Sequence, residues 1–195
     1  MNTPAVFIDR DGTINEQMGY INHPSRFLLL PGAAEAIRIL NRSGYLAIVV
    51  SNQSGVARGY FPIDLVHRVH DRMEKVLSAE GAWIDGIFFC PHHPQGEVPE
   101  YAVACDCRKP GTGLIGEARN RFDIDMAGSY VIGDRCQDLE MARRAGLPGV
   151  LVLTGYGRGE REYVLPGEAV RPAYIAEDIL GAVRWIIAVG KLQGG

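Results

Sequence analysis

The stretch "AVFIDRDGT" (residues 5–13) decides how the rest of the chain is interpreted. Its first residues are apolar without polar alternation, which predicts a strand that is buried on both faces. The run ends on Asp9, a residue type that strands disfavour. One interpretation is a turn cap, because "DGT" is good turn chemistry. The other is a carboxylate that faces a ligand crevice at the end of the strand.

Apolar runs alternate with helical periodicity along the rest of the chain. The predicted strands are residues 5–9, 45–51, 84–90, 129–134 and 149–155. The predicted helices are residues 31–44, 62–81, 112–122, 137–146 and 176–189. This alternation predicts an α/β fold, with a parallel sheet covered by helices on both faces. Ligands of such sheets bind beyond the carboxyl ends of the strands. The residues expected at that edge are Asp9, Ser51, Cys90 and Asp134.

Length and composition limit the class of protein. A chain of 195 residues suits one domain, here residues 1–195. A hydrophobic content of 47% with 22% charged residues is typical of a soluble globular protein. The net charge of −3 lacks the basic footprint of a nucleic-acid binder. Without an apolar run of membrane-spanning length or a secretory signal, we expect a cytoplasmic protein.

Acidic side chains gather at the predicted edge of the sheet. They are Asp9, Asp11, Asp134 and Asp138. Carboxylates this close repel one another unless a cation lies among them, and one or two Asp side chains with water suit Mg²⁺. Arg108 and Lys109, in "CDCRKPG", carry the positive charge that a bound phosphate needs. The sequence therefore predicts phosphoryl-transfer chemistry.

The spacing of the first two aspartates suggests a division of roles. Asp9 would be the nucleophile that forms an aspartyl-phosphate, a known form of covalent catalysis. Asp11, two residues further on, would protonate the leaving group and then activate water. As an acid it needs a pKa above the ordinary value of about 3.9.

Four segments carry a resemblance to a known superfamily. In chain order, "FIDRDGT", "VVSNQSG", "CRKP" and "GDRCQD" resemble the signature segments of haloacid dehalogenase-like phosphatases. Within that superfamily, "GIFFCPHHPQG…CDCRKP" resembles the D-glycero-D-manno-heptose 1,7-bisphosphate 7-phosphatase family. The resemblance implies a capless Rossmannoid fold and a phosphorylated sugar as substrate. For a small capless phosphatase we also expect a monomer. It also implies removal of the 7-phosphate on the pathway to ADP-heptose, which is used in bacterial lipopolysaccharide.

The resemblance also implies site roles. Mg²⁺ would be held by Asp9, Asp134 and the main-chain carbonyl of Asp11, while Ser51 and Lys109 would hold the transferring phosphoryl group. Asp138 would orient Lys109 or a metal-bound water. The implied substrate-binding residues are Gln17, Met18, Gly19, Tyr20, Asn52, Gln53, Ser54, Arg108 and Arg135. Arg135 stands where the family often has Lys, so the charge is kept with a different geometry.

A second constellation lies in an aperiodic loop at about residues 90–110: Cys90, His92, Cys105 and Cys107. Three thiolates and one imidazole suit tetrahedral zinc, and four protein ligands predict a structural rather than a catalytic site. The resemblance implies the same zinc loop. The alternatives are His93 as the imidazole, or buried thiols with a disulfide, which a cytosolic protein disfavours. Cys136 is predicted to be a small packing residue.

Other functions and stretches stay open at this point. The alternative phosphatase substrates are histidinol phosphate, whose relatives tend to have Asp where Ser54 stands, and less favoured, a DNA 3′-phosphate end. A non-catalytic zinc-binding interaction module is an alternative of another class. Residues 51–61 are either a phosphate-binding turn or a simple loop. Residues 155–162 are either a mobile loop or the border of the substrate site. No chemistry is assigned to His67 and His70.

Overall fold

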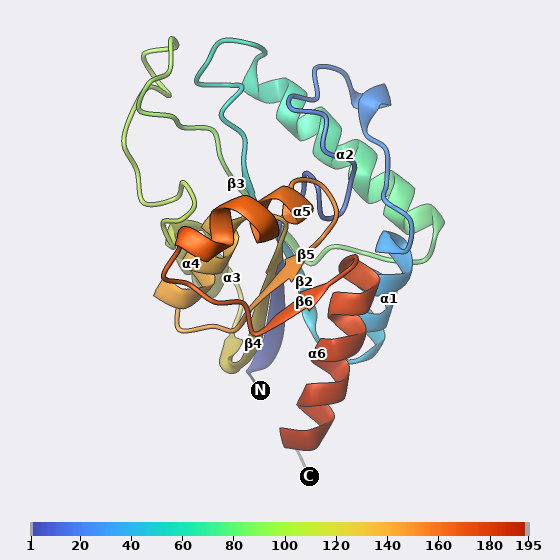
Figure 1. Ribbon diagram of the computed structural model, residues 1–195. Coiled ribbons are helices and arrows are strands. Elements are labelled where there is room, and N and C mark those ends of the chain that lie inside the picture. Colours follow the sequence, from blue (N-terminus) through green and yellow to red (C-terminus); the bar gives the residue numbers. More distant parts are fainter. Residues whose placement is uncertain (1, 194–195) are drawn as a thin grey trace.

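Six parallel strands form the centre of the computed structural model, which describes residues 2–193 of the chain (Figure 1). They are β1 (Thr3–Ile8), β2 (Leu46–Asn52), β3 (Gly86–Cys90), β4 (Ile124–Gly133), β5 (Gly149–Val152) and β6 (Tyr174–Ala176). Their spatial order is β3-β2-β1-β4-β5-β6, and every neighbouring pair is parallel. The order reverses between β1 and β4, which is the point where such sheets form a ligand crevice.

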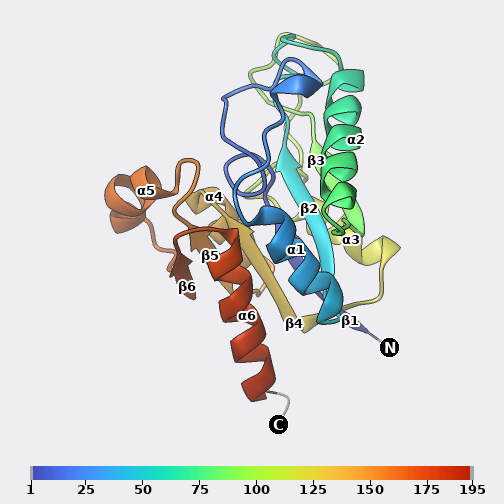
Figure 2. The same cartoon turned by 90° about the vertical axis from the view of Figure 1, so that its right-hand side faces the viewer.

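Helices cover both faces of the sheet, as the sequence predicted. The longer helices are α1 (Ala33–Arg42), α2 (Ile63–Ala79), α3 (Gly113–Arg121), α4 (Cys136–Arg144) and α6 (Ile179–Gln193). Helices α1, α2 and α6 pack on one face, and α3 and α4 pack on the other (Figures 1 and 2). The short helical turns are η1 (Pro24–Arg26), α5 (Gly157–Gly159), η2 (Glu160–Val164) and η3 (Leu165–Gly167).

The two apolar layers explain why β1 shows no polar alternation. Val6 and Ile8 belong to the core cluster under α1, α2 and α6. Ala5 and Phe7 face the cluster under α3 and α4. All four side chains are completely buried. A central parallel strand has no solvent face, so its sequence is continuously apolar up to the point where Asp9 leaves the sheet.

The fold differs from the prediction at three places. Strand β6 was not predicted, because three residues are too few to show alternation, and α6 begins at Ile179 rather than at residue 176. Strand β4 begins at Ile124, well before the predicted residue 129. Its register with β1 shifts between Pro4 and Val6. Residues 157–167, for which no helix was predicted, form α5, η2 and η3.

The connections on the carboxyl side of the sheet are compact. Residues 9–32 contain η1 and otherwise turns, and residues 91–112 contain neither helix nor strand. Among the described residues, no inserted cap domain therefore covers this edge. None of the described helices combines the length and the apolar character that crossing a membrane requires.

Candidate active site

A pocket opens at the carboxyl edge of β1, β2 and β4, and it collects most of the predicted site residues. The predicted catalytic residues Asp9, Asp11 and Ser51 line it. The predicted substrate residues that line it are Gln17, Gly19, Tyr20, Asn52, Gln53, Ser54, Arg108 and Arg135. Met18 does not line this pocket, because its sulfur lies against Arg26, 3.9 Å from Nη2. Residues 51–54 thus line the same cavity as Gln17, Gly19 and Tyr20.

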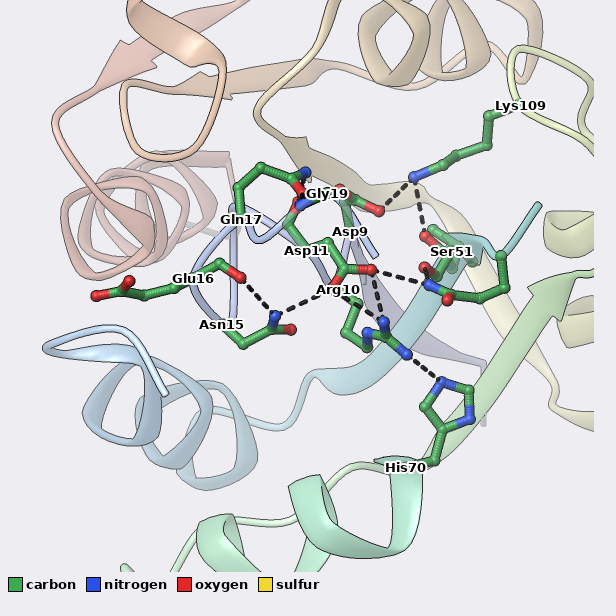
Figure 3. Close-up of polar contacts among 12 residues, drawn as sticks. Asp9, Arg10, Asp11, Asn15, Glu16, Gln17, Gly19, Ser51, His70 and Lys109 are labelled. Atoms are coloured by element: carbon green, nitrogen blue, oxygen red, sulfur yellow. Dashed lines mark hydrogen bonds and ion pairs between the residues drawn. The ribbon is translucent and has the colours of Figure 1, made fainter. Parts of the chain in front are cut away.

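Lys109 lies beneath the pocket, between two carboxylates. Its Nζ is 2.6 Å from Asp9 Oδ1 and 2.6 Å from Asp138 Oδ1 (Figure 3 shows the pair with Asp9). It also donates to the main-chain oxygen of Val50, at 3.0 Å. Burial acts to lower the pKa of Lys109, but the two carboxylates raise it above its ordinary value. The lysine is therefore a fixed positive charge at the end of β1.

Asp134 follows β4 and is fully buried. Its Oδ2 accepts a hydrogen bond of 2.8 Å from the main-chain N–H of Tyr156. Glycines leave room for this carboxylate: a Cβ on Gly12 or on Gly155 would lie 2.1 Å from Asp134 Oδ2. Both glycines have positive φ, of +90° and +55°. No other residue type fits either position without displacing Asp134.

The donor set of the pocket floor fits a divalent cation. Burial, with the charges of Asp9 and Asp138, raises the pKa of Asp134 to about 8. Burial also raises the pKa of Asp9 to about 7, although Lys109 opposes the rise. Asp134 Oδ1 is buried without a hydrogen-bond partner among the described residues. Because buried carboxylates need partners, Mg²⁺ among them would satisfy both the charge and the orphaned oxygen.

Asp138 belongs to the same cluster of carboxylates, but both of its oxygens already contact other groups of the protein. One carboxylate oxygen of each of Asp9, Asp134 and Asp138 lies within 4.8 Å of the others. Asp138 Oδ1 pairs with Lys109, and its Oδ2 accepts from the main-chain N–H of Arg135 at 3.2 Å. These contacts favour Asp9 and Asp134 as metal ligands and agree with the expected role of Asp138 in orienting Lys109.

Asp11 is held by a network of donors (Figure 3). The Arg10 guanidinium binds both of its oxygens through Nη2, at 2.9 and 2.7 Å. Asn15 Nδ2 donates to Oδ1 and Gln53 Nε2 to Oδ2. Burial acts to raise the pKa of Asp11, but Arg10 and these donors together lower it. The expectation of a raised pKa is therefore not met in this state of the protein.

His70 takes part in this network, although the sequence analysis assigned it no chemistry. The residue lies on α2 and is 5% exposed. Its Nε2 is 3.1 Å from Nη1 of Arg10, which is itself buried (Figure 3). Burial lowers the pKa of His70 to about 3, with the Arg10 charge adding to the effect. A neutral His70 accepts the hydrogen bond from Arg10 and thereby fixes the cation that holds Asp11.

Strand β2 supplies two further contacts. Ser51 Oγ lies 2.7 Å from Gln53 Nε2, so the serine hydroxyl faces the pocket beside Asp11. Asn52 binds the main chain of Lys109 twice: its Oδ1 accepts from the N–H at 3.0 Å, and its Nδ2 donates to the carbonyl at 3.2 Å. The Asn52 amide therefore attaches the loop that carries Lys109 to the sheet.

The predicted zinc ligands Cys90, His92, Cys105 and Cys107 form one cluster. Cys107 Sγ is 3.0 Å from Cys90 Sγ and 3.2 Å from Cys105 Sγ. His92 Nδ1 lies 3.3 Å from Cys107 Sγ. All four cysteines of the chain are free, so the disulfide alternative is wrong.

The chemistry of these ligands fits zinc. Burial raises the pKa of Cys90 to about 11. Burial and hydrogen bonds with the other two thiols also raise the pKa of Cys107. A cation is needed to stabilise thiolates in such surroundings, and zinc binds this combination of sulfur and imidazole. The alternative imidazole, His93, lies outside the cluster, with its Nε2 3.1 Å from Arg58 Nη2.

The zinc loop ends at the pocket. Cys107 is followed directly by Arg108, which lines the pocket, and by the buried Lys109. Arg108 Nη1 also donates to the carbonyl of His92, at 3.3 Å. Metal ligation would therefore fix the position of both cations.

The pocket also contains residues that the sequence analysis did not single out as functional. Gln137 and Tyr156 line it. Arg10 lines it as well, and His70 lies behind Arg10, as described above. Arg10 stands between two signature aspartates, which was a usable signal. Tyr156 comes from the undecided stretch 155–162, so the structure supports the interpretation that this stretch borders the pocket.

Loss of one thiol should release the zinc. We expect Cys107→Ser to reduce zinc from about one per chain to a small fraction, and the thermal midpoint to fall by about 5 °C or more. Turnover should fall because Arg108 and Lys109 lose their anchor. Cys136→Ser is the matched control, since Cys136 lies outside the cluster. Stoichiometric zinc in the Cys107 variant, measured by elemental analysis, would contradict the assignment.

Comparisons with known proteins agree with this geometry. A family model described as HAD-hydrolase-like matches residues 106–182. A D-glycero-D-manno-heptose-1,7-bisphosphate 7-phosphatase of Thermosynechococcus vestitus is 44% identical over 193 residues, which cover 95% of this chain and 96% of that protein. A D-glycero-beta-D-manno-heptose-1,7-bisphosphate 7-phosphatase of Rhodopseudomonas palustris is 47% identical over 146 residues, covering 75% of this chain and 81% of that protein.

A solved structure extends the likeness to three dimensions. The crystal structure of D,D-heptose 1,7-bisphosphate phosphatase from B. bronchiseptica, complexed with magnesium and phosphate, has a TM-score of 0.82 and 31% identity. The match covers 98% of this chain and 99% of that one. Sequence identity over nearly the full length and the shared fold lead to one conclusion. The chain belongs to the D-glycero-D-manno-heptose-1,7-bisphosphate 7-phosphatase family of haloacid dehalogenase-like hydrolases.

Proposed function

We propose that this protein is a magnesium-dependent phosphatase that removes the 7-phosphate of D-glycero-D-manno-heptose 1,7-bisphosphate, a step in ADP-heptose synthesis for lipopolysaccharide. The observation that carries the proposal is the convergence of Asp9, Lys109 and Asp134 beneath one pocket. The substrate class is supported by the relatives described above, which are heptose bisphosphatases by name.

Asp9 is the nucleophile of the proposed reaction. One of its carboxylate oxygens attacks phosphorus, the bond between phosphorus and the C7 oxygen breaks, and Asp11 protonates the departing alkoxide. In the second half-reaction Asp11 takes a proton from water, whose oxygen attacks the aspartyl-phosphate. Inorganic phosphate leaves and the Asp9 carboxylate is restored. The lysine at 2.6 Å orients Asp9 throughout.

Asp11 must carry a proton in the first half-reaction, although Arg10 lowers its pKa in the structure. A phosphate bound beside it adds negative charge to the pocket, and such a charge raises the pKa of a neighbouring carboxyl group. Substrate binding thus supplies the condition for general acid catalysis. Arg10, fixed by His70, keeps the carboxyl group aimed at the pocket in both half-reactions.

The transferring phosphoryl group is held by this chain's own donors. Ser51 Oγ and Lys109 Nζ are the proposed donors to its oxygens. Mg²⁺, when bound by Asp9, Asp134 and the main-chain carbonyl of Asp11, supplies charge neutralisation to the phosphoryl oxygens. Gln17, which also lines the pocket, has its Nε2 3.5 Å from that carbonyl.

We also propose that the protein works as a cytoplasmic monomer of one domain, residues 1–195. The described site residues all come from one chain and surround one sheet edge. Three clustered thiols without a disulfide are typical of a reducing compartment, which favours the cytoplasm.

Asp9→Asn should lower turnover by about 10³-fold or more, because an amide cannot form the aspartyl-phosphate. The fold should survive, since Lys109 keeps Asp138 as a partner and one buried carboxylate fewer repels Asp134. Phosphate release and the thermal midpoint measure the two effects. Asp71→Asn, on the exposed side of α2, is the matched control. A fully active Asp9 variant would refute the mechanism.

Asp134→Asn should weaken magnesium binding. We expect the Mg²⁺ concentration for half-maximal turnover to rise by at least about tenfold, because the variant loses one of the proposed ligands. The protein should be freed of Mg²⁺ by gel filtration rather than by chelator, so that zinc stays in place. An unchanged Mg²⁺ dependence with full activity would exclude Asp134 as a ligand.

The substrate assignment is tested by side-by-side kinetics on heptose 1,7-bisphosphate, histidinol phosphate and fructose 1,6-bisphosphate. We expect kcat/KM to be highest for the heptose bisphosphate by at least about tenfold, because one well-placed charged contact is worth about that factor. Equal or higher kcat/KM for histidinol phosphate would replace the proposed substrate.

A further inference from the structure

Arg135 is held at the rim of the pocket by two residues of the segment 154–164. Its guanidinium carbon lies 5.0 Å from the centre of the Tyr156 ring. Its Nε lies 3.4 Å from Glu160 Oε1. The terminal nitrogens, Nη1 and Nη2, donate no hydrogen bond to the residues that the structure describes. The Arg135 guanidinium is thus held by its Nε edge against Glu160 and by its planar face against Tyr156. The side chain is 46% exposed.

Glu160 is itself anchored. It is only 9% exposed, and its Oε2 accepts a hydrogen bond of 2.8 Å from the main-chain N–H of Cys136. That N–H belongs to the first residue of α4, where a helix favours negative charge. The carboxylate therefore stays in place independently of Arg135 and offers it a preformed partner. The segment 157–164 lies beside α4 in Figure 1.

The main chain around Tyr156 is tied to the catalytic floor. The N–H of Tyr156 donates to Asp134, and the hydroxyl of Thr154 donates to the carbonyl of Gly12 at 2.6 Å. These hydrogen bonds fix the main chain at Tyr156, and therefore the position of its side chain. The ring is 46% exposed and lines the pocket. Its face is therefore available to the guanidinium, and such contacts attract a cation.

We propose that Tyr156 and Glu160 are positioning residues that hold Arg135 toward the pocket, where its free terminal nitrogens bind the second anionic group of a bisphosphate substrate. A planar guanidinium with two free N–H groups matches a phosphate in bidentate geometry. Holding it in advance reduces the conformational entropy lost on binding. The inference rests on the proposed function, because it assumes a substrate with a phosphate besides the one that reacts at Asp9.

The arrangement also gives a reason for arginine at this position. A lysine has no Nε–H edge for Glu160 and no planar face to stack on Tyr156. Arg135, Tyr156 and Glu160 therefore form one functional set. In this protein Arg135→Lys would not be conservative, although it keeps the charge.

The test compares kcat/KM for heptose 1,7-bisphosphate with kcat/KM for the same sugar carrying only the 7-phosphate. We expect Tyr156→Leu and Glu160→Gln to lower this ratio about threefold to tenfold, mainly through KM, as loss of a cation–π contact or a charged partner predicts. Arg135→Lys should lower it similarly. Tyr156→Phe keeps the ring and should keep the ratio. Tyr163→Leu, on the same segment and 78% exposed, is the control.

A double variant separates positioning from general structural damage. Arg135→Ala should lower the ratio, and adding Tyr156→Leu should lower it no further, because Tyr156 acts through Arg135. A further decrease in the double variant would overturn the inference. So would an unchanged ratio in Tyr156→Leu with normal zinc content and thermal midpoint. Wild-type protein that hydrolyses neither substrate would overturn the proposed function and this inference together.

Discussion

The buried contact of Lys109 with Asp9 and Asp138 is the interaction on which the site depends. Two carboxylates at 2.6 Å hold one ammonium group where water is nearly excluded. Removal of the Lys109 ammonium group would leave two buried carboxylates without their common partner, which is far more costly than the loss of an exposed ion pair. The lysine reaches this position from the zinc loop, which the Asn52 amide ties to β2. The position of the catalytic lysine therefore depends on the structure of the loop that carries the proposed zinc ligands.

Lysine alone does not balance the acidic groups around it. Asp134 adds a third carboxylate, whose pKa is raised by burial and by the charges of Asp9 and Asp138 although Lys109 opposes the rise. Its Oδ1 has no hydrogen-bond partner among the described residues. Gly12 and Gly155 keep this carboxylate in place by backbone conformations that other residues rarely adopt. The two glycines thus allow the acidic side chains to pack closely. The negative charge of these side chains then favours a divalent cation at the site.

Much of the floor of the site could be predicted from the sequence because parallel strands end at one edge. The positions of Asp9 and Asp134 follow from that rule, whatever lies between them in the chain. The Arg10–His70 contact could not be predicted, since it depends on how helix α2 is placed against β1. Strand β6 was missed because three residues carry no periodic signal. The lowered pKa of Asp11 arises mainly from Arg10 and Asn15, which are close to it in the sequence, whereas the contribution of Gln53 comes from a separate segment and could not be predicted from a local pattern.

The floor and the rim of the pocket are built differently, and this difference has a functional consequence. Floor residues such as Lys109 and Asp138 are buried and pair with each other, so substitution of either one disturbs the other. Rim residues such as Arg135 and Tyr156 are half exposed and held by a few contacts from residues 154–164. Substitution at the rim changes one contact and leaves the floor intact. Substrate preference can therefore change at the rim while the phosphoryl-transfer chemistry below it stays the same, because the side-chain contacts that hold Arg135 are different from those that hold Lys109.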